Sequence, residues 1–235
     1  MDDLKRLINE LETLANKEQA ENLQRFFKTG KGEYGDGDIF LGISVPMQRK
    51  IAKRYLNLSL SKIQELLKSE IHEHRFIALL ILIEKYAKGN ERDKENIFGF
   101  YLKNTKYINN WDLVDISSHK IIGDFLKEKD RKILYALANS KNLWEKRISI
   151  ISTFSFIKDK DFGDALALSE ILMNDSHDLI HKAVGWVLRE IGNKDLEVEE
   201  NFLKFHYKKM PRTMLRYAIE KFEEEKRRRY LLGNI

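Results

Sequence analysis

The sequence predicts an all-α fold in which about six HEAT-like helix pairs form one curved solenoid with a basic concave face. Three observations lead to this prediction. Residues that favour helices dominate the chain, and only two of its 235 residues are proline. No segment shows sustained strand alternation between Asn-Gly or Asp-Gly turns. A degenerate repeat of helix-pair length also runs through most of the chain.

Apolar residues recur at spacings of three and four, as on one face of a helix. The first two stripes are Leu4, Leu7, Ile8, Leu11 and Leu14, and then Ile63, Leu66 and Leu67. Pro46 and Pro211 lie where helices should begin, because a proline in the first helical turn loses no hydrogen bond. Further helices are predicted at residues 71–88, 92–104, 112–127, 130–139, 143–157, 162–174, 177–191, 196–209 and 211–226.

One long irregular segment interrupts the helices at about residues 30–38. It contains Gly30, Gly32, Gly35 and Gly37, and so many glycines predict a flexible loop. The segment lacks the Gly-Lys-Ser/Thr ending of a P-loop and follows no predicted strand. Nucleotide binding is therefore not expected there.

Composition narrows the class of protein. The chain has 42 Lys and Arg against 37 Asp and Glu, a net charge of +5, and no Cys, which excludes disulfides, Cys-ligated metals and a thiol nucleophile. No run approaches the roughly 20 apolar residues of a membrane span, and the first residues do not resemble a signal peptide. We expect a soluble, cytoplasmic, monomeric protein whose residues 1–235 form a single domain. The mild basic excess permits a nucleic-acid partner without requiring one.

The repeat becomes visible when five segments are aligned at positions 75, 115, 147, 182 and 216, which are 40, 32, 35 and 34 residues apart. Four of these positions are basic: Arg75, Arg147, Lys182 and Arg216. If the second helix of each pair lines the inner face, the four form a basic row suited to a phosphate backbone. The alternative is that each cation pairs with a neighbouring repeat, as most charges do.

Asp115 occupies the remaining register position. Trp111 precedes it by four residues, Trp186 follows Lys182 by four, and Trp144 precedes Arg147 by three. Aromatic faces beside one anion would stabilise a cationic group. Each tryptophan taken alone is more often a core residue, and a carboxylate among cations is more often part of a salt bridge.

Four segments resemble the AlkD-type DNA alkylation repair glycosylases, which are HEAT-like solenoids. They are FLGISVP at 40–46, NWDLVD at 110–115, LWEKR at 143–147 and KAVGWVLRE at 182–190. The matches follow the family's order over about residues 25–192. The resemblance implies excision of N3- and N7-alkylated purines from duplex DNA, without drawing the base into a deep pocket and without a metal or cofactor.

The resemblance also implies roles for individual residues. Asp115 would be the catalytic carboxylate, and Trp111 and Trp186 would face the deoxyribose of the lesion. Arg147 would hold backbone phosphate near the lesion, and Arg189 would be a further DNA contact. Phe26 corresponds to a family tyrosine, whose hydroxyl Tyr34 would replace; this departure bears on lesion preference.

Two other functions remain open: a non-enzymatic DNA-binding protein, for duplex or branched DNA, and a protein-binding solenoid scaffold. Asp115 is the one acidic residue at a repeat position that is otherwise basic, and this favours the glycosylase over the other two functions. The pairs His72/His74 and His177/His181 lack the third ligand of a zinc site, so no metal is expected. The basic run at residues 226–229 is interpreted as a solvated tail, with phosphate contact as the alternative.

Overall fold

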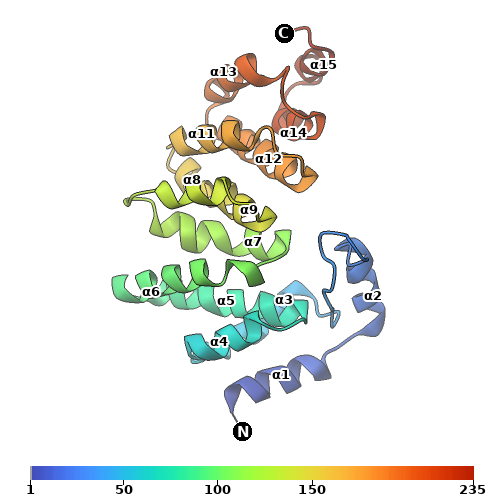
Figure 1. Ribbon diagram of the computed structural model, residues 1–235, viewed down its shortest axis with the longest axis vertical. Coiled ribbons are helices and arrows are strands. Elements are labelled where there is room, and N and C mark those ends of the chain that lie inside the picture. Colours follow the sequence, from blue (N-terminus) through green and yellow to red (C-terminus); the bar gives the residue numbers. More distant parts are fainter. Residues whose placement is uncertain (1) are drawn as a thin grey trace. The chain divides into compact units, whose positions relative to one another are not determined.

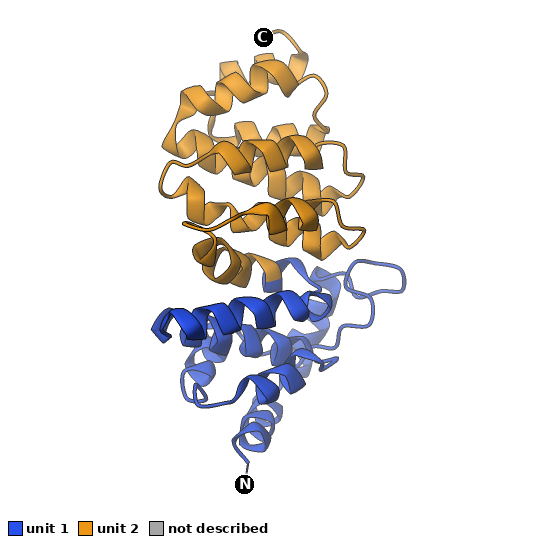
Figure 2. Cartoon of the chain, turned by 60° about the vertical axis from the view of Figure 1, so that its left-hand side comes forward, with its two compact units in different colours: residues 1–113 blue, residues 114–235 orange. Residues whose placement is uncertain are grey.

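The structure, a computed structural model, describes residues 2–235 and is built almost entirely of helices (Figure 1). These residues form no β-strand; Ile39 and Ile71 make one isolated parallel bridge. The all-α prediction and the helical repeat are confirmed. The chain divides into two compact units, residues 1–113 and 114–235 (Figure 2). No helix of the described residues is long and apolar enough to span a bilayer.

Unit 1 is organised around its longest helix, α5. This helix packs against α3, α4 and α6 and is buried on most of its faces, with charged His72, Glu73 and Arg75 covered at its first turn. The bounds in this unit are α1 Asp3–Thr13, α2 Lys17–Phe26, α3 Val45–Ala52, α4 Leu60–Leu67, α5 His72–Lys88, α6 Glu91–Lys103, the 3₁₀ turn η1 Thr105–Tyr107, and the start of α7, Trp111–Ser118.

Unit 2 is organised around α12, which packs against α9, α11, α13 and α14. Gly185 permits a close approach of α14, because a Cβ there would lie 2.4 Å from the carbonyl oxygen of Met214. The bounds are the π turn η2 His119–Gly123, α8 Lys132–Ala138, α9 Leu143–Ser152, α10 Phe154–Ile157, α11 Gly163–Leu172, α12 Asp178–Lys194, α13 Leu196–His206, α14 Arg212–Ala218, the 3₁₀ turn η3 Ile219–Lys221, and α15 Glu224–Leu232.

Three predicted helices are interrupted. The α-helix expected at residues 112–127 ends at Ser118 and continues as the π turn η2. In this turn the carbonyl of His119 accepts a hydrogen bond from Ser155, and Gly123 lies against the backbone of Ser152. The segment 143–157 divides into α9 and α10, and 211–226 divides before α15. The helix α2 was not predicted, because it buries no residue and so carries no core stripe.

The segment 30–38 is the loop that its glycines predict. Gly32 and Gly37 adopt φ values of 80° and 84°, which favour glycine. The loop is closed by its own acidic side chains, since Glu33 accepts from the backbone of Gly30 and Asp36 from that of Gly32. Its flexibility stays a prediction.

The chain that leaves this loop is fastened to the start of α5. The carboxylate of Glu73 accepts three backbone N–H groups, from Leu41 at 2.9 Å, Gly42 at 2.8 Å and Ile43 at 3.2 Å. Gly42 has a φ of 83° and packs on the backbone of Asn16, where a Cβ would collide. A buried carboxylate with three N–H partners is satisfied without a countercharge. These contacts give the FLGISVP segment a structural role.

Candidate functional site

The first turn of α7 is fixed by polar side chains from its own sequence. Asn110 accepts a hydrogen bond from the backbone N–H of Trp111 at 2.8 Å, and Asp112 accepts from that of Leu113 at 2.8 Å. Both satisfy N–H groups that a helix start leaves without an intrahelical partner. The sequence NNWD therefore starts the helix that carries Trp111 and, four residues later, Asp115.

Trp111 belongs to unit 1, where two phenylalanines of α2 and its end hold its ring. Phe27 stacks on Trp111 with ring centroids 5.1 Å apart, and Phe26 meets it edge-on at 5.8 Å. Phe26 is 63% exposed, so this aromatic surface is open to solvent. Tyr34 donates from its hydroxyl to the carbonyl oxygen of Phe26 at 3.4 Å. The Tyr34 hydroxyl thus contacts the backbone of Phe26, and its replacement of the family hydroxyl stays a prediction.

In unit 1, a polar cluster includes both sequence neighbours of Trp111. We call it the His72 cluster; its members are Asp38, His72, Arg75, Asn110 and Asp112. The two ring nitrogens of His72 lie 3.2 Å from Asp38 (Nδ1) and 2.8 Å from Asp112 (Nε2). Arg75 donates to Asp38 at 2.6 Å, and Asn110 donates to it at 3.3 Å. His72 is 3% exposed.

Electrostatics favour a charged His72. Burial disfavours the imidazolium, but the neighbouring carboxylates of Asp112 and Asp38 outweigh burial and raise the pKa of His72 to about 9. Burial likewise opposes ionisation of Asp38, but the His72 hydrogen bond and the Arg75 charge lower its pKa. At neutral pH the cluster therefore holds two cations, His72 and Arg75, against two carboxylates.

In unit 2, Asp115 is bound by Arg147 of α9. The Nε of Arg147 donates to one carboxylate oxygen at 2.8 Å, and Nη2 donates to the other at 2.7 Å. Nη1 donates to the backbone oxygen of Leu179 at 2.6 Å, which holds the guanidinium in place. A bidentate pair of this geometry requires an ionised carboxylate. The Asp115 side chain retains 16% exposure, so its carboxylate is not sealed from solvent.

The other two tryptophans differ in exposure. Trp186 lies on α12, meets Phe154 edge-on at 4.7 Å and donates from Nε1 to Glu190 at 3.2 Å. It is partly exposed. Trp144 is buried in the core of unit 2. The core alternative therefore holds for Trp144, and the convergence of the tryptophans on Asp115 stays a prediction.

The predicted row of exposed cations is wrong for two of its four members. Arg75 and Arg147 are buried, because each needs a carboxylate partner inside the fold, Asp38 and Asp115 respectively. The expectation that Arg147 also holds backbone phosphate stays a prediction, because in the structure its guanidinium is bound to Asp115 and to the backbone oxygen of Leu179. For both arginines, the structure agrees with the alternative that each cation forms an ion pair within the fold.

The remaining predicted contacts lie nearer the surface of unit 2. Lys182 pairs with Asp178 one helical turn away at 2.8 Å. Arg189 is mostly covered and pairs with Glu220. Arg216 is exposed on α14. Lys182 and Arg216 are thus placed where they could meet a polyanion, whereas Arg189 would first have to exchange its partner.

Positive charge is concentrated at the C-terminal end. Residues 204–235 contain ten Lys and Arg against four Asp and Glu, so they exceed the whole chain's net charge of +5. Among them Arg227, Arg228 and Arg229 are exposed on α15. The sequence reveals this asymmetry, which the repeat register does not, because the register samples one residue per repeat.

The histidine pairs are used structurally. His74 interacts with Ser69 at 3.0 Å, and burial and the nearby Arg75 lower its pKa to about 4. His177 accepts from the backbone of Leu179, and His181 contacts the backbone oxygen of Asp175. Within residues 2–235 no three His, Cys, Asp or Glu side chains are grouped to hold a metal.

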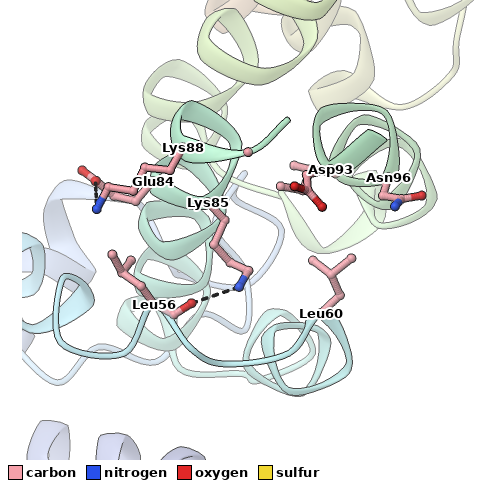
Figure 3. Close-up of a pocket in the computed structure, with 9 residues that line it drawn as sticks. Leu56, Leu60, Glu84, Lys85, Lys88, Asp93 and Asn96 are labelled. Carbon is pink, nitrogen blue, oxygen red and sulfur yellow. Dashed lines mark hydrogen bonds and ion pairs between the residues drawn. The ribbon is translucent and has the colours of Figure 1, made fainter. Parts of the chain in front are cut away.

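A pocket of about 360 Å³ lies at the far end of α5 from the His72 cluster (Figure 3). Its walls include Leu56, Leu60 and Ile97 beside Glu84 and Lys85. Lys85 points across it and donates to the backbone oxygen of Leu56 at 2.9 Å. The pocket is lined by Glu84, Lys85 and Lys88 in the last turns of α5, whereas His72 is the first residue of this 17-residue helix, so the pocket is separate from the His72 cluster.

Sequence reasoning did not find the contacts that His72 makes with Asp38 and Asp112. These residues are 34 and 40 positions apart, with no motif linking them. The sequence drew attention to His72 only as one of two neighbouring histidines, which could be a metal ligand or a core residue.

Comparisons with known proteins identify the family and the fold. The protein family described as DNA alkylation repair enzyme matches residues 7–222. A solved structure titled as a predicted DNA alkylation repair enzyme from Enterococcus faecalis is similar, with a TM-score of 0.69, 15% identity, and coverage of 89% of this chain and 97% of that one. AlkD2 from Streptococcus mutans has a TM-score of 0.56 and 17% identity, covering 88% and 99%. No curated protein matches the sequence.

Proposed function

The chain belongs to the DNA alkylation repair enzyme family, and we propose that it is a DNA glycosylase that releases positively charged N3- and N7-alkylated purines from duplex DNA. The observation that carries the proposal is Asp115. This carboxylate is ionised, held in one orientation by Arg147, partly open to solvent, and four residues from an accessible tryptophan.

The chemistry requires little of the protein. An alkylated purine already carries positive charge, so when the bond between C1′ and the base nitrogen breaks, the bonding electrons leave with the base, which departs neutral. No general acid is needed. The deoxyribose passes through an oxocarbenium-like transition state, and water then adds to C1′ and releases a proton. The products are the free base and an abasic site.

Asp115 would act on the sugar. A fixed carboxylate near C1′ stabilises the developing positive charge, and one such group is worth about 3–4 kcal/mol in comparable sites. The same carboxylate can orient the attacking water and accept its proton. Trp111 and Trp186 would offer aromatic faces to the deoxyribose, which a cationic transition state favours.

Arg147 acts on Asp115 in this proposal. Its fork keeps the carboxylate ionised and fixes its orientation before DNA arrives. Preorganisation of this kind avoids reorganising the site during the reaction. Phosphate binding is assigned to exposed cations instead, among them Lys182, Arg216 and those of α15. No cofactor is invoked, and the protein is proposed to act as a monomer on DNA in the cytoplasm.

Base release from methylated duplex DNA tests the proposal. The wild type should free 3-methyladenine or 7-methylguanine, identified by chromatography, and Asp115→Asn should bind DNA but release at least about 100-fold less. Asp159→Asn is the matched control, because Asp159 is an exposed partner of Lys127 in the same unit and should behave as wild type. Thermal unfolding of each variant shows that loss of release is not loss of fold.

The alternative is a DNA-binding protein without glycosylase activity. It predicts tight, salt-dependent binding to duplex or branched DNA and no free base from any alkylated substrate, in wild type and variant alike. That pair of results would replace the enzyme proposal. Absence of DNA binding at moderate salt would point to a protein scaffold.

A further inference from the structure

We infer that His72 is a positioning residue: held as an imidazolium between Asp38 and Asp112, it sets the place of Trp111 at the start of α7. This inference rests on the proposed function, since it assigns Trp111 to the substrate-facing surface. His72 itself is buried, so it would act through Trp111.

The geometry of the bridge favours a doubly protonated ring. Both nitrogens of His72 lie within hydrogen-bond distance of a carboxylate oxygen, 3.2 Å to Asp38 and 2.8 Å to Asp112. An ionised carboxylate only accepts hydrogen bonds, so both ring nitrogens must donate. A neutral imidazole has one N–H, so its unprotonated nitrogen would face a carboxylate oxygen and no hydrogen bond could form there. The bridge therefore needs the charged ring.

The bridge joins the end of the glycine-rich loop to the start of the helix that carries Trp111 and Asp115. Asp38 ends the glycine-rich loop, and Asp112 is the second residue of α7, next to Trp111. Asn110, on the other side of Trp111, is also bound to Asp38, at 3.3 Å. Both neighbours of Trp111 are thus tied to the same cluster, so the backbone that carries the tryptophan cannot shift without breaking it.

The rings provide a second connection. Phe27 lies against both His72, at 5.2 Å, and Trp111, at 5.1 Å, where the rings are nearly parallel. Phe40 stacks on His72 at 4.5 Å and on Phe27 at 5.1 Å. Removing the imidazolium would loosen Phe27 as well as the start of α7. Errors of about 1 Å in a reacting group can cost on the order of 100-fold in rate.

The experiment compares His72→Gln with His74→Gln. His74 lies on the same helix and is also buried, but its ring hydrogen-bonds to Ser69 and forms no ion-pair bridge between two carboxylates. Protein labelled with 5-fluorotryptophan gives a fluorine resonance for Trp111, assigned with Trp111→Phe. We expect His72→Gln to move or broaden this resonance and His74→Gln to leave it in place.

Kinetics supply the second measurement. At saturating methylated DNA, His72→Gln should slow single-turnover base release by about 10-fold or more, while DNA affinity stays within about 2-fold because the phosphate contacts are untouched. His74→Gln should match wild type in both. If His72→Gln does not fold, Asp112→Asn removes the same ion pair with an isosteric side chain and replaces it in both measurements.

The outcomes separate this inference from the proposed function. An unmoved Trp111 resonance, or an unchanged rate of release in an active protein, overturns the role of His72. A moved Trp111 resonance in a protein whose wild type releases no base supports positioning and rejects the glycosylase. Nitrogen shifts of the His72 ring at pH 8 give an independent check: two protonated nitrogens are required, and a neutral ring contradicts the bridge.

Discussion

The guanidinium of Arg147 donates to both carboxylate oxygens of Asp115, so the two side chains form a forked ion pair between α7 and α9. We predict that Arg147→Lys, which keeps the charge but loses the fork, lowers the free energy of unfolding by about 1–3 kcal/mol. Base release should fall at least about 10-fold because Asp115 is no longer held.

Denaturant unfolding and single-turnover release measure these two effects. Arg131→Lys is the matched control, because Arg131 also binds two carboxylates, Asp161 and Asp164, in unit 2. It should lose stability but release base at the wild-type rate once folded. Equal losses of activity in both variants would mean that stability, and not the orientation of Asp115, is being measured.

Gly185→Ala should destabilise the protein. The new Cβ would lie 2.4 Å from the backbone oxygen of Met214 and 2.5 Å from the Cβ of Tyr217, so α12 and α14 would have to separate. We expect a loss of about 1–3 kcal/mol, measured by urea unfolding. Gly99→Ala, in α6, places its Cβ in open space and should instead gain up to about 1 kcal/mol. A neutral Gly185→Ala would show that the helices can part without cost.

Glu199 makes stability depend on pH. Burial, reinforced by the charge of Glu200, raises the pKa of Glu199 to about 8, well above its ordinary 4.5. The folded protein therefore holds a proton that the unfolded chain releases, so this group lowers stability progressively as pH rises from about 4.5 to about 8.

Glu199→Gln should remove that dependence. At pH 8.5 it should be more stable than wild type by roughly 2–4 kcal/mol, with a smaller difference at pH 5. Glu197→Gln, an exposed position on the same helix, should change little at either pH. Parallel stability curves for Glu199→Gln and wild type between pH 5 and 8.5 would contradict the raised pKa.

The three exposed arginines of α15 should contribute to DNA binding. They lie beyond residue 222, where the family match ends, in the segment 204–235, which has ten Lys and Arg against four Asp and Glu. Replacing residues 227–229 by Gln should reduce the slope of log affinity against log salt by about 1–3, since each phosphate contact contributes about 0.9. The triple Lys variant keeps the charge and should keep the slope. An unchanged slope in the Gln variant would restore the solvated-tail interpretation.

Sequence periodicity predicted the fold because burial dictates it directly. The apolar stripe of α1 and the glycines of residues 30–38 determine the structure of their own segments. Pro46 and Pro211 lie at the starts of α3 and α14, as expected. The π turn after Ser118 could not be predicted, since it depends on contacts of His119 and Gly123 with residues more than 25 positions away. Local patterns do not contain such contacts.

The candidate site was predictable only in part. Asp115 stood out because it breaks a basic register, and the structure pairs it with Arg147 of the next repeat. The same register suggested exposed arginines, but Arg75 and Arg147 are buried, because a sequence shows a charge and not its partner. The roles of His72 and Asp112 depend on a contact between residues 40 positions apart, which no spacing rule indicates.

The π turn at residues 119–123 has a consequence for comparing this chain with others. A π hydrogen bond spans five residues where an α bond spans four, so the turn holds one residue more than a regular helix would. A relative that lacks this residue could continue α7 without interruption. At identities of 15% and 17%, alignments should therefore be allowed a one-residue gap here, between Asp115 and Arg147, before residue roles are transferred across it.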